Sequence, residues 1–246
     1  MKKFIPNAIT LLNLLCGSIA VIFVVNNNFV TGAFFVFLGI FFDFFDGLAA
    51  RKLNVQSELG VQLDSLADMV TSGLVPGMVM YKLINLSYSS WDNIEVASNS
   101  ILNFSNISLF PLLGLTITLA SAYRLAKFNI DEDQQTYFKG LPTPANTLLI
   151  ISLPLILEFQ NNDALNAIIL NKWFLIVLTV LSCYLLNSNI KLFALKFKDY
   201  SFKNNAIRYI FIILCIVLLV VLQFAAIPII ILLYIIMSLL NNLTSK

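Results

Sequence analysis

The stretch from Asp43 to Asp68 carries four carboxylates at helical spacing inside a strongly apolar sequence. It reads Asp43-Phe-Phe-Asp46-Gly47-Leu-Ala-Ala50-Arg51, continues for eight residues to Gly60, and ends with Asp64 and Asp68. The first two acids are three residues apart and the last two are four apart, so each pair projects from one face of its own helix. A buried carboxylate is costly unless it is paired or bound to a metal. The stretch therefore predicts two neighbouring helices that meet at a site for divalent cations.

The composition indicates a polytopic membrane protein. The 246-residue chain is 59% hydrophobic and only 11% charged, whereas a soluble domain carries roughly 25% charged residues. It contains no histidine, which excludes histidine general bases and histidine-ligated zinc. The cysteines Cys16, Cys183 and Cys215 lie within apolar runs, and we expect them to be buried hydrophobic residues without disulfides.

Apolar segments of spanning length recur along the chain and predict an all-α, polytopic transmembrane helical bundle with about eight spans. The expected spans are 7–25, 30–50, 60–83, 106–128, 143–159, 170–187, 206–223 and 226–241. We interpret the first as a retained helix and not as a signal peptide. A polar segment at 84–105 is expected to be the longest connection before the fourth span. We assign residues 1–160 to the catalytic core and 161–246 to additional C-terminal transmembrane helices.

The placement of Lys and Arg predicts the orientation. With a cytoplasmic N-terminus, only Lys82 and Lys172 of the 15 basic residues fall on the far side, which is a decisive positive-inside bias. The acidic residues then lie at the cytoplasmic side of helices 1–5. We therefore expect an integral protein of a bacterial-type inner (cytoplasmic) membrane, with its active site facing the cytoplasm. The basic stretch 191–208 is expected to contact anionic lipid head groups, and no nucleic-acid partner is expected.

Residues next to the four acids indicate a site that binds a phosphate-containing substrate. Two metal ions can clamp a diphosphate and stabilise both the attacking and the leaving oxygen. Gly47 and Gly60 let the backbone come close to a phosphate or a metal, and Arg51 offers a fork for phosphate oxygens. The alternative, a salt-bridged helix end, fits poorly because only Arg51 and Lys52 are available locally to neutralise the acids.

The pattern D-x2-D-G-x2-A-R-x8-G-x3-D-x3-D resembles the signature of the CDP-alcohol phosphatidyltransferases. The resemblance implies a membrane enzyme that takes a CDP-linked donor such as CDP-diacylglycerol and binds two divalent cations, Mg²⁺ or Mn²⁺. It implies that Asp43, Asp46, Asp64 and Asp68 are the metal ligands and that Asp68 is also the general base. The acceptor hydroxyl would attack the phosphorus that bears the lipid and expel CMP. Family members also suggest a homodimer.

A motif near the N-terminus resembles the first helix of the same family. It reads Pro6-Asn7-x2-Thr10-x2-Asn13-x3-Gly17. Thr10, Asn13 and Gly17 share one helix face, and we expect Asn13 to bond the cytosine and Thr10 to bond a phosphate or sugar. The alternative is that these polar residues only join membrane helices to one another.

Two further segments, 122–129 and 138–145, resemble the branch of the family that uses L-serine, the CDP-diacylglycerol–serine O-phosphatidyltransferases. Arg124 and Lys127, three residues apart, would hold the serine carboxylate or the donor phosphate; alternatively, they only mark a helix end by snorkelling. Gly140-Leu-Pro142 is a turn expected at the pocket rim.

Two other functions stay open. One is a sibling enzyme that uses glycerol 3-phosphate or inositol as its acceptor. The other is a cation transporter, which would need a polar path that the remaining spans do not provide.

Overall fold

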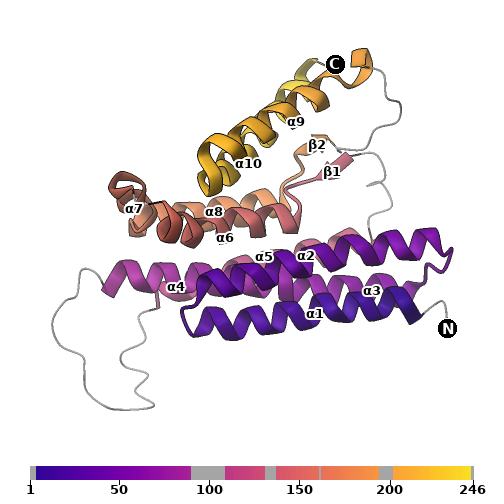
Figure 1. Ribbon diagram of the computed structural model, residues 1–246, viewed down its shortest axis with the longest axis horizontal. Coiled ribbons are helices and arrows are strands. Elements are labelled where there is room, and N and C mark those ends of the chain that lie inside the picture. The colour runs from indigo at the N-terminus through magenta and orange to yellow at the C-terminus, as the bar shows by residue number, and fades with distance from the viewer. Residues whose placement is uncertain (1–3, 90–108, 131–136, 161, 194–201, 245–246) are drawn as a thin grey trace.

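The computed structural model describes residues 4–89, 109–130, 137–160, 162–193 and 202–244. These residues form a helical bundle with one small two-stranded ribbon (Figure 1). The all-α fold predicted from hydropathy is therefore confirmed, and the predicted loop at 84–105 lies largely outside the described residues. Its first residues continue a helix that ends at Ser89.

The N-terminal half consists of helices joined by short connections. It comprises α1 (Phe4–Val25), α2 (Phe29–Lys52), α3 (Glu58–Asp68), the π-helix η1 (Met69–Leu74) and α4 (Val75–Ser89). Asn28 caps α2 by accepting a hydrogen bond from the Thr31 amide, and Ser57 caps α3 by accepting one from the Gly60 amide. These caps fix where the two acidic helices begin.

The C-terminal half alternates helices with short strands. It comprises η3 (Pro111–Leu115), α5 (Thr116–Ile130), β1 (Tyr137–Lys139), α6 (Thr143–Phe159), α7 (Asp163–Ile169), α8 (Lys172–Asn187), β2 (Lys191–Phe193), α9 (Phe202–Leu222), η4 (Gln223–Ala225) and α10 (Ala226–Thr244). Strands β1 and β2 pair antiparallel, with Phe138 opposite Leu192. This ribbon joins the segment that precedes α6 to the segment that follows α8.

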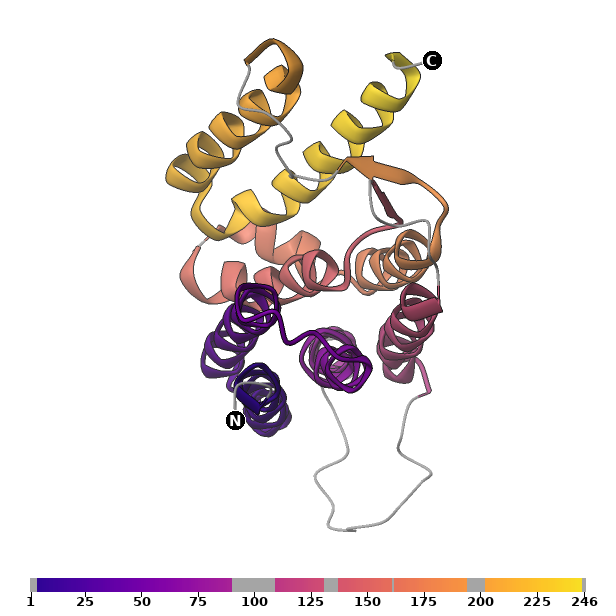
Figure 2. The same cartoon turned by 90° about the vertical axis from the view of Figure 1, so that its right-hand side faces the viewer.

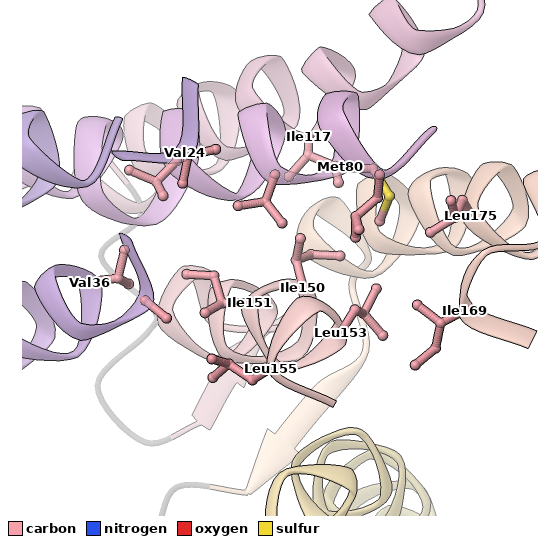
Figure 3. Packing of buried hydrophobic residues seen from close by; sticks show 14 of the residues in the cluster. Val24, Val36, Met80, Ile117, Ile150, Ile151, Leu153, Leu155, Ile169 and Leu175 are labelled. Carbon is pink, nitrogen blue, oxygen red and sulfur yellow. The ribbon is translucent and has the colours of Figure 1, made fainter. Parts of the chain in front are cut away.

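The helices lie in three tiers. Helices α1–α5 form one tier, α6 and α8 pack on it and run in much the same direction, and α9 and α10 form a hairpin on the other side of α6 (Figures 1 and 2). The core lies between the first two tiers, where Val36, Met80, Ile117, Ile150 and Leu175 pack together (Figure 3). Each of these side chains is at most 2% exposed.

Four helical stretches are long and apolar enough to cross a membrane. They are Phe4–Val25, Phe29–Lys52, Glu58–Tyr88 and Arg208–Leu240, and the bent pair α7–α8 would be a fifth. The outward face of α2 exposes Phe34, Phe37, Phe41 and Phe44, as expected of a helix in lipid. The described part of the chain therefore supports an integral membrane protein, whereas the count of eight spans stays a prediction.

Candidate active site

Three of the four predicted aspartates, from α2 and α3, lie close together. Asp43 and Asp46 come from α2 and Asp64 from α3, and one oxygen of each lies within 4.8 Å of the other two. The spacing of three on α2 turns both of its acids toward α3. The sequence prediction that the two acidic helices converge is therefore matched by the geometry.

These three carboxylates suit a divalent cation. The carboxyl groups of Asp43 and Asp64 lie within hydrogen-bonding reach of each other, Asp46 is only 6% exposed, and Asp64 Oδ1 is buried without a hydrogen-bond partner among the described residues. Like charges this close need a proton or a cation between them. An all-oxygen donor set is the one that Mg²⁺ and Mn²⁺ prefer.

Helix α1 holds one of these carboxylates in place. Thr10 Oγ1 donates a hydrogen bond of 2.6 Å to Asp46 Oδ2, and the Thr10 side chain is 3% exposed. A buried hydroxyl-to-carboxylate bond restricts the rotamer of the acid. Thr10 on α1 therefore orients Asp46, a candidate metal ligand on α2.

Asp68 lies outside the three-carboxylate group and has its own partner. Asn13 Nδ2 donates a hydrogen bond of 3.2 Å to Asp68 Oδ1, and Asn13 is completely buried. The backbone of Asn13 is held in turn, because Thr71 Oγ1 donates to the Asn13 carbonyl at 3.1 Å. The geometry thus gives Asp68 a fixed orientation beside the acidic cluster.

A π-helical turn, η1, follows directly after Asp68. Turns of this kind are uncommon and are frequent at functional sites. Here α1 comes close to it, since a Cβ added at Gly17 would press against Thr71 Oγ1 and lie 3.0 Å from Thr71 Cα. Sequence reasoning missed both η1 and Thr71, because no local pattern distinguishes a π-turn from a continuous α-helix.

A cavity of about 730 Å³ opens beside the acidic cluster, which is ample for a small-molecule ligand. Its lining includes the predicted residues Thr10, Asp46, Gly47, Arg51, Gly60 and Asp64. Arg51 Nε donates to the Gly47 carbonyl at 3.0 Å, which turns the guanidinium back along α2. Asn13 is not among the residues that line this cavity and contacts Asp68; its contact with a cytosine stays a prediction.

Arg124 and Lys127 line a separate, small cavity together with Lys139 and Asn187. Arg124 is 8% exposed and lies close enough to Asp68 for electrostatic interaction. Its Nε has no hydrogen-bond partner in the described part of the chain. A snorkelling arginine would reach solvent, and this one is buried instead. Phe128, which sequence reasoning did not single out, lines both cavities.

The predicted turn at Gly140 directly follows Lys139, which lines the small cavity. Gly140 has φ +74°, and its amide donates to the Ile190 carbonyl at 2.9 Å. A Cβ there would lie 2.7 Å from the Leu186 carbonyl oxygen. Glycine is therefore required by both the left-handed backbone and the close approach to the end of α8.

Comparison with known proteins agrees with this site. Residues 3–185 match the CDP-alcohol phosphatidyltransferase family, and this match extends past the boundary at 160 that we predicted for the catalytic core. That boundary stays a prediction. Residues of α8 such as Asn187 line the small cavity with Arg124, so the candidate site draws on residues after 160.

Three relatives carry the name CDP-diacylglycerol–serine O-phosphatidyltransferase. The protein of Bacillus subtilis is 36% identical over 166 residues, which cover 68% of this chain and 81% of the relative. That of Methanocaldococcus jannaschii is 30% identical over 165 residues, 67% of this chain and 66% of the relative. That of Saccharomyces cerevisiae is 33% identical over 129 residues, 49% and 40% of the two chains. The chain belongs to the CDP-alcohol phosphatidyltransferase family, because the family match covers most of its length and its aspartate pattern and converging carboxylates agree with that match.

Proposed function

We propose that this protein transfers the phosphatidyl group of CDP-diacylglycerol to the hydroxyl of L-serine, giving phosphatidylserine and CMP. The observation that carries the proposal is the group of Asp43, Asp46 and Asp64, of which Asp46 is buried and the other two are half-buried, beside a cavity large enough for a nucleotide. The choice of serine is supported by the names of the relatives and by the buried Arg124. Glycerol 3-phosphate and inositol are the sibling acceptors to be tested.

The cavity beside the cluster suits the CDP end of the donor. Arg51 and the slim Gly47 lie on its wall and would face the diphosphate. Asp43, Asp46 and Asp64, with Asp68 as a further candidate ligand, would hold two divalent cations, Mg²⁺ or Mn²⁺. When bound, such ions stabilise negative charge on a diphosphate and on its leaving group.

Asp68 is proposed as the general base. Asn13 orients its carboxylate through one oxygen, which leaves the other to accept a proton from the acceptor hydroxyl. The hydroxyl oxygen then bonds to the lipid-bearing phosphorus as the bond from that phosphorus to CMP breaks. With no histidine in the chain, a carboxylate is the most suitable base.

Arg124 is proposed to bind the serine carboxylate. It lies within electrostatic range of Asp68, so a carboxylate on Arg124 would bring the serine hydroxyl toward the base. The buried surroundings strengthen such a pairing. Lys127 lines the same small cavity and would add positive charge at its mouth.

We further propose that the site faces the cytoplasm of a bacterial-type inner membrane, in a homodimer. At the end of the bundle away from the acids, Lys82 Nζ donates to the Val25 carbonyl and Lys172 lies over the Tyr88 ring. These are the two basic residues that the sequence assigned to the far side. Arg51 and Arg124 lie at the acidic end, as the positive-inside rule expects.

The test is CMP release by the purified protein in detergent micelles. We expect release with CDP-diacylglycerol and L-serine, loss of release in EDTA, and recovery with Mg²⁺ or Mn²⁺. Asp43→Asn and Asp64→Asn should each lower kcat by about 10²-fold or more while the protein still purifies. Release with glycerol 3-phosphate or inositol but not with serine would refute the acceptor. Cation transport by the protein in sealed lipid vesicles, without CMP release, would refute the enzyme.

A further inference from the structure

Two side chains that have no role in the mechanism above join the acidic helix α3 to the end of α5. Ser65 Oγ donates a hydrogen bond of 3.1 Å to Asn129 Oδ1, and Asn129 Nδ2 donates one of 2.9 Å to Ser65 Oγ. Both polar atoms of the carboxamide therefore contact the same hydroxyl, which can donate and accept at once. The Ser65–Asn129 pair restrains the last turn of α5 against α3.

Ser65 lies between the two acids of α3. It directly follows Asp64, a candidate metal ligand, and precedes Asp68, the proposed base, by three residues. Residues three apart share a helix face, so Ser65 and Asp68 lie toward the same neighbours. Helix α5 is one of them, because it packs against α3 and its Arg124 lies within electrostatic range of Asp68. A restraint on Ser65 is therefore a restraint on the helix that carries both acids.

Asn129 lies where the two cavities come together. The residue before it, Phe128, lines both the large and the small cavity. Arg124 and Lys127, which precede it on α5, line the small one. Ser65 and Asn129 are not among the residues that line either cavity. The pair therefore holds the boundary between the two cavities in place from outside them.

Other contacts hold the small cavity itself together. Its walls on α5 and α8 are joined by Asn187 Nδ2, which donates to the Ala120 carbonyl at 3.1 Å. The Leu141 amide, beyond the Gly140 turn, donates to the Leu185 carbonyl at 2.9 Å. Neither bond involves α3. Without the Ser65–Asn129 pair the small cavity would therefore stay formed but could shift against α3, because the last turn of a helix opens readily.

We infer that Asn129 is a positioning residue that, through Ser65, aligns the small cavity on α5 with the acids of α3. This inference rests on the proposed function, because it takes the small cavity to bind one end of the acceptor through Arg124. The acceptor hydroxyl has to reach Asp68 and the donor phosphorus at the same time. A misplacement of about 1 Å between reacting groups costs up to about 10²-fold in rate. The pair thus acts on kcat and not on the binding of either substrate.

A double-mutant cycle on CMP release by the purified full-length protein in detergent tests this role. Ser65→Ala removes the hydroxyl and Asn129→Ala removes the carboxamide. Each should lower kcat by about three- to tenfold, the effect of losing one uncharged hydrogen bond. The KM values for CDP-diacylglycerol and for L-serine should both stay within about twofold. The double variant should be no slower than the slower single variant, because both substitutions remove the same contact.

Gln62→Ala is the matched control on α3. Asn129 Nδ2 also donates to Gln62 Oε1, but at 3.5 Å, a separation at which a hydrogen bond is weak. Like Ser65, Gln62 is not among the residues that line either cavity. Gln62→Ala should keep kcat and both KM values. Melting temperatures of all four variants in detergent report on folding, and each should fall by no more than about 4 °C.

The outcomes distinguish the inference from the function on which it rests. If the unmodified protein uses serine but Ser65→Ala and Asn129→Ala keep its kcat within about twofold, the pair only joins two helices and the inference is overturned. Losses of kcat that multiply in the double variant, or an equal loss in Gln62→Ala, overturn it as well. If the unmodified protein releases CMP with none of serine, glycerol 3-phosphate and inositol, the proposed function and the inference both fall. Release with one of the other two alone overturns only the serine assignment, and the same cycle with that acceptor then decides the role of the pair.

Discussion

Replacing Gly17 by alanine tests whether the contact between α1 and η1 positions Asp68, the proposed base. The added methyl group would press against Thr71 Oγ1 and lie 3.0 Å from Thr71 Cα and N. Ordinary carbon contacts are about 3.5–4.0 Å, and the backbone of η1 cannot rotate away as a side chain would. The two elements must therefore separate by roughly 1 Å, at a cost of about 1–3 kcal/mol in stability.

The separation acts on catalysis through a single hydrogen bond. Asn13 lies one turn before Gly17, and its 3.2 Å bond to Asp68 spans the same interface. A misplacement of about 1 Å in a catalytic group costs about 10²-fold in rate. We expect Gly17→Ala to lower kcat by about 10- to 100-fold. The KM for CDP-diacylglycerol should change by less than about twofold, since neither Gly17 nor Thr71 lines the large cavity.

Steady-state CMP release and a detergent melting curve measure the two effects separately. Gly32→Ala is the control, because it crowds α1 against α2 near Val24, where the nearest atom is a side-chain methyl at 2.9 Å. It should affect the melting temperature without affecting kcat. A Gly17→Ala protein with lowered melting temperature and normal kcat would refute the positioning role of this contact. Equal kcat losses in both variants would refute it as well.

Three other perturbations have defined outcomes. Thr10→Val removes the 2.6 Å bond to Asp46, and the Mg²⁺ concentration for half-maximal activity should rise about 10- to 100-fold; an unchanged metal titration would contradict the role of Thr10. Gly140→Ala forces a side chain into φ +74° against carbonyl oxygens at 2.7–2.9 Å, so the melting temperature should fall, and a variant as stable as the parent would contradict this account. Cysteines replacing the exposed Lys52 and Asn162 should react with an impermeant maleimide from the cytoplasmic and the opposite side respectively; the reverse pattern would invert the topology.

The acidic cluster could be predicted because its geometry is local. Spacings of three and four within one helix determine which acids share a face, and a shared need for a counter-ion draws the two faces together. The same reasoning grouped Asp68 with the others. The structure holds Asp68 apart through Asn13, a contact between residues 55 positions apart in the chain that no local spacing determines.

The positions of the helices could be predicted from the sequence better than the number of membrane spans. Hydropathy located the long helices but missed the short α7, and the predicted spans 206–223 and 226–241 both overlap the single apolar stretch Arg208–Leu240. Likewise Arg124 was selected for its charge, whereas its burial depends on the β1–β2 ribbon, which brings Gly140 against the end of α8. Pairing between strands so far apart in the chain leaves no periodic signal in either segment.

The residues that orient the aspartates and the residue proposed to bind the acceptor lie in different parts of the chain, which explains why the aspartate pattern does not determine the acceptor. Thr10 and Asn13, three residues apart on α1, hold Asp46 and Asp68 respectively, so one rigid helix sets the distance between a proposed metal ligand and the proposed base. All of these residues precede η1. Arg124, which is proposed to bind the acceptor, follows it on α5. Substitutions around Arg124 can therefore change the acceptor while the donor chemistry is preserved, because they leave the carboxylates and the hydrogen bonds that orient them untouched.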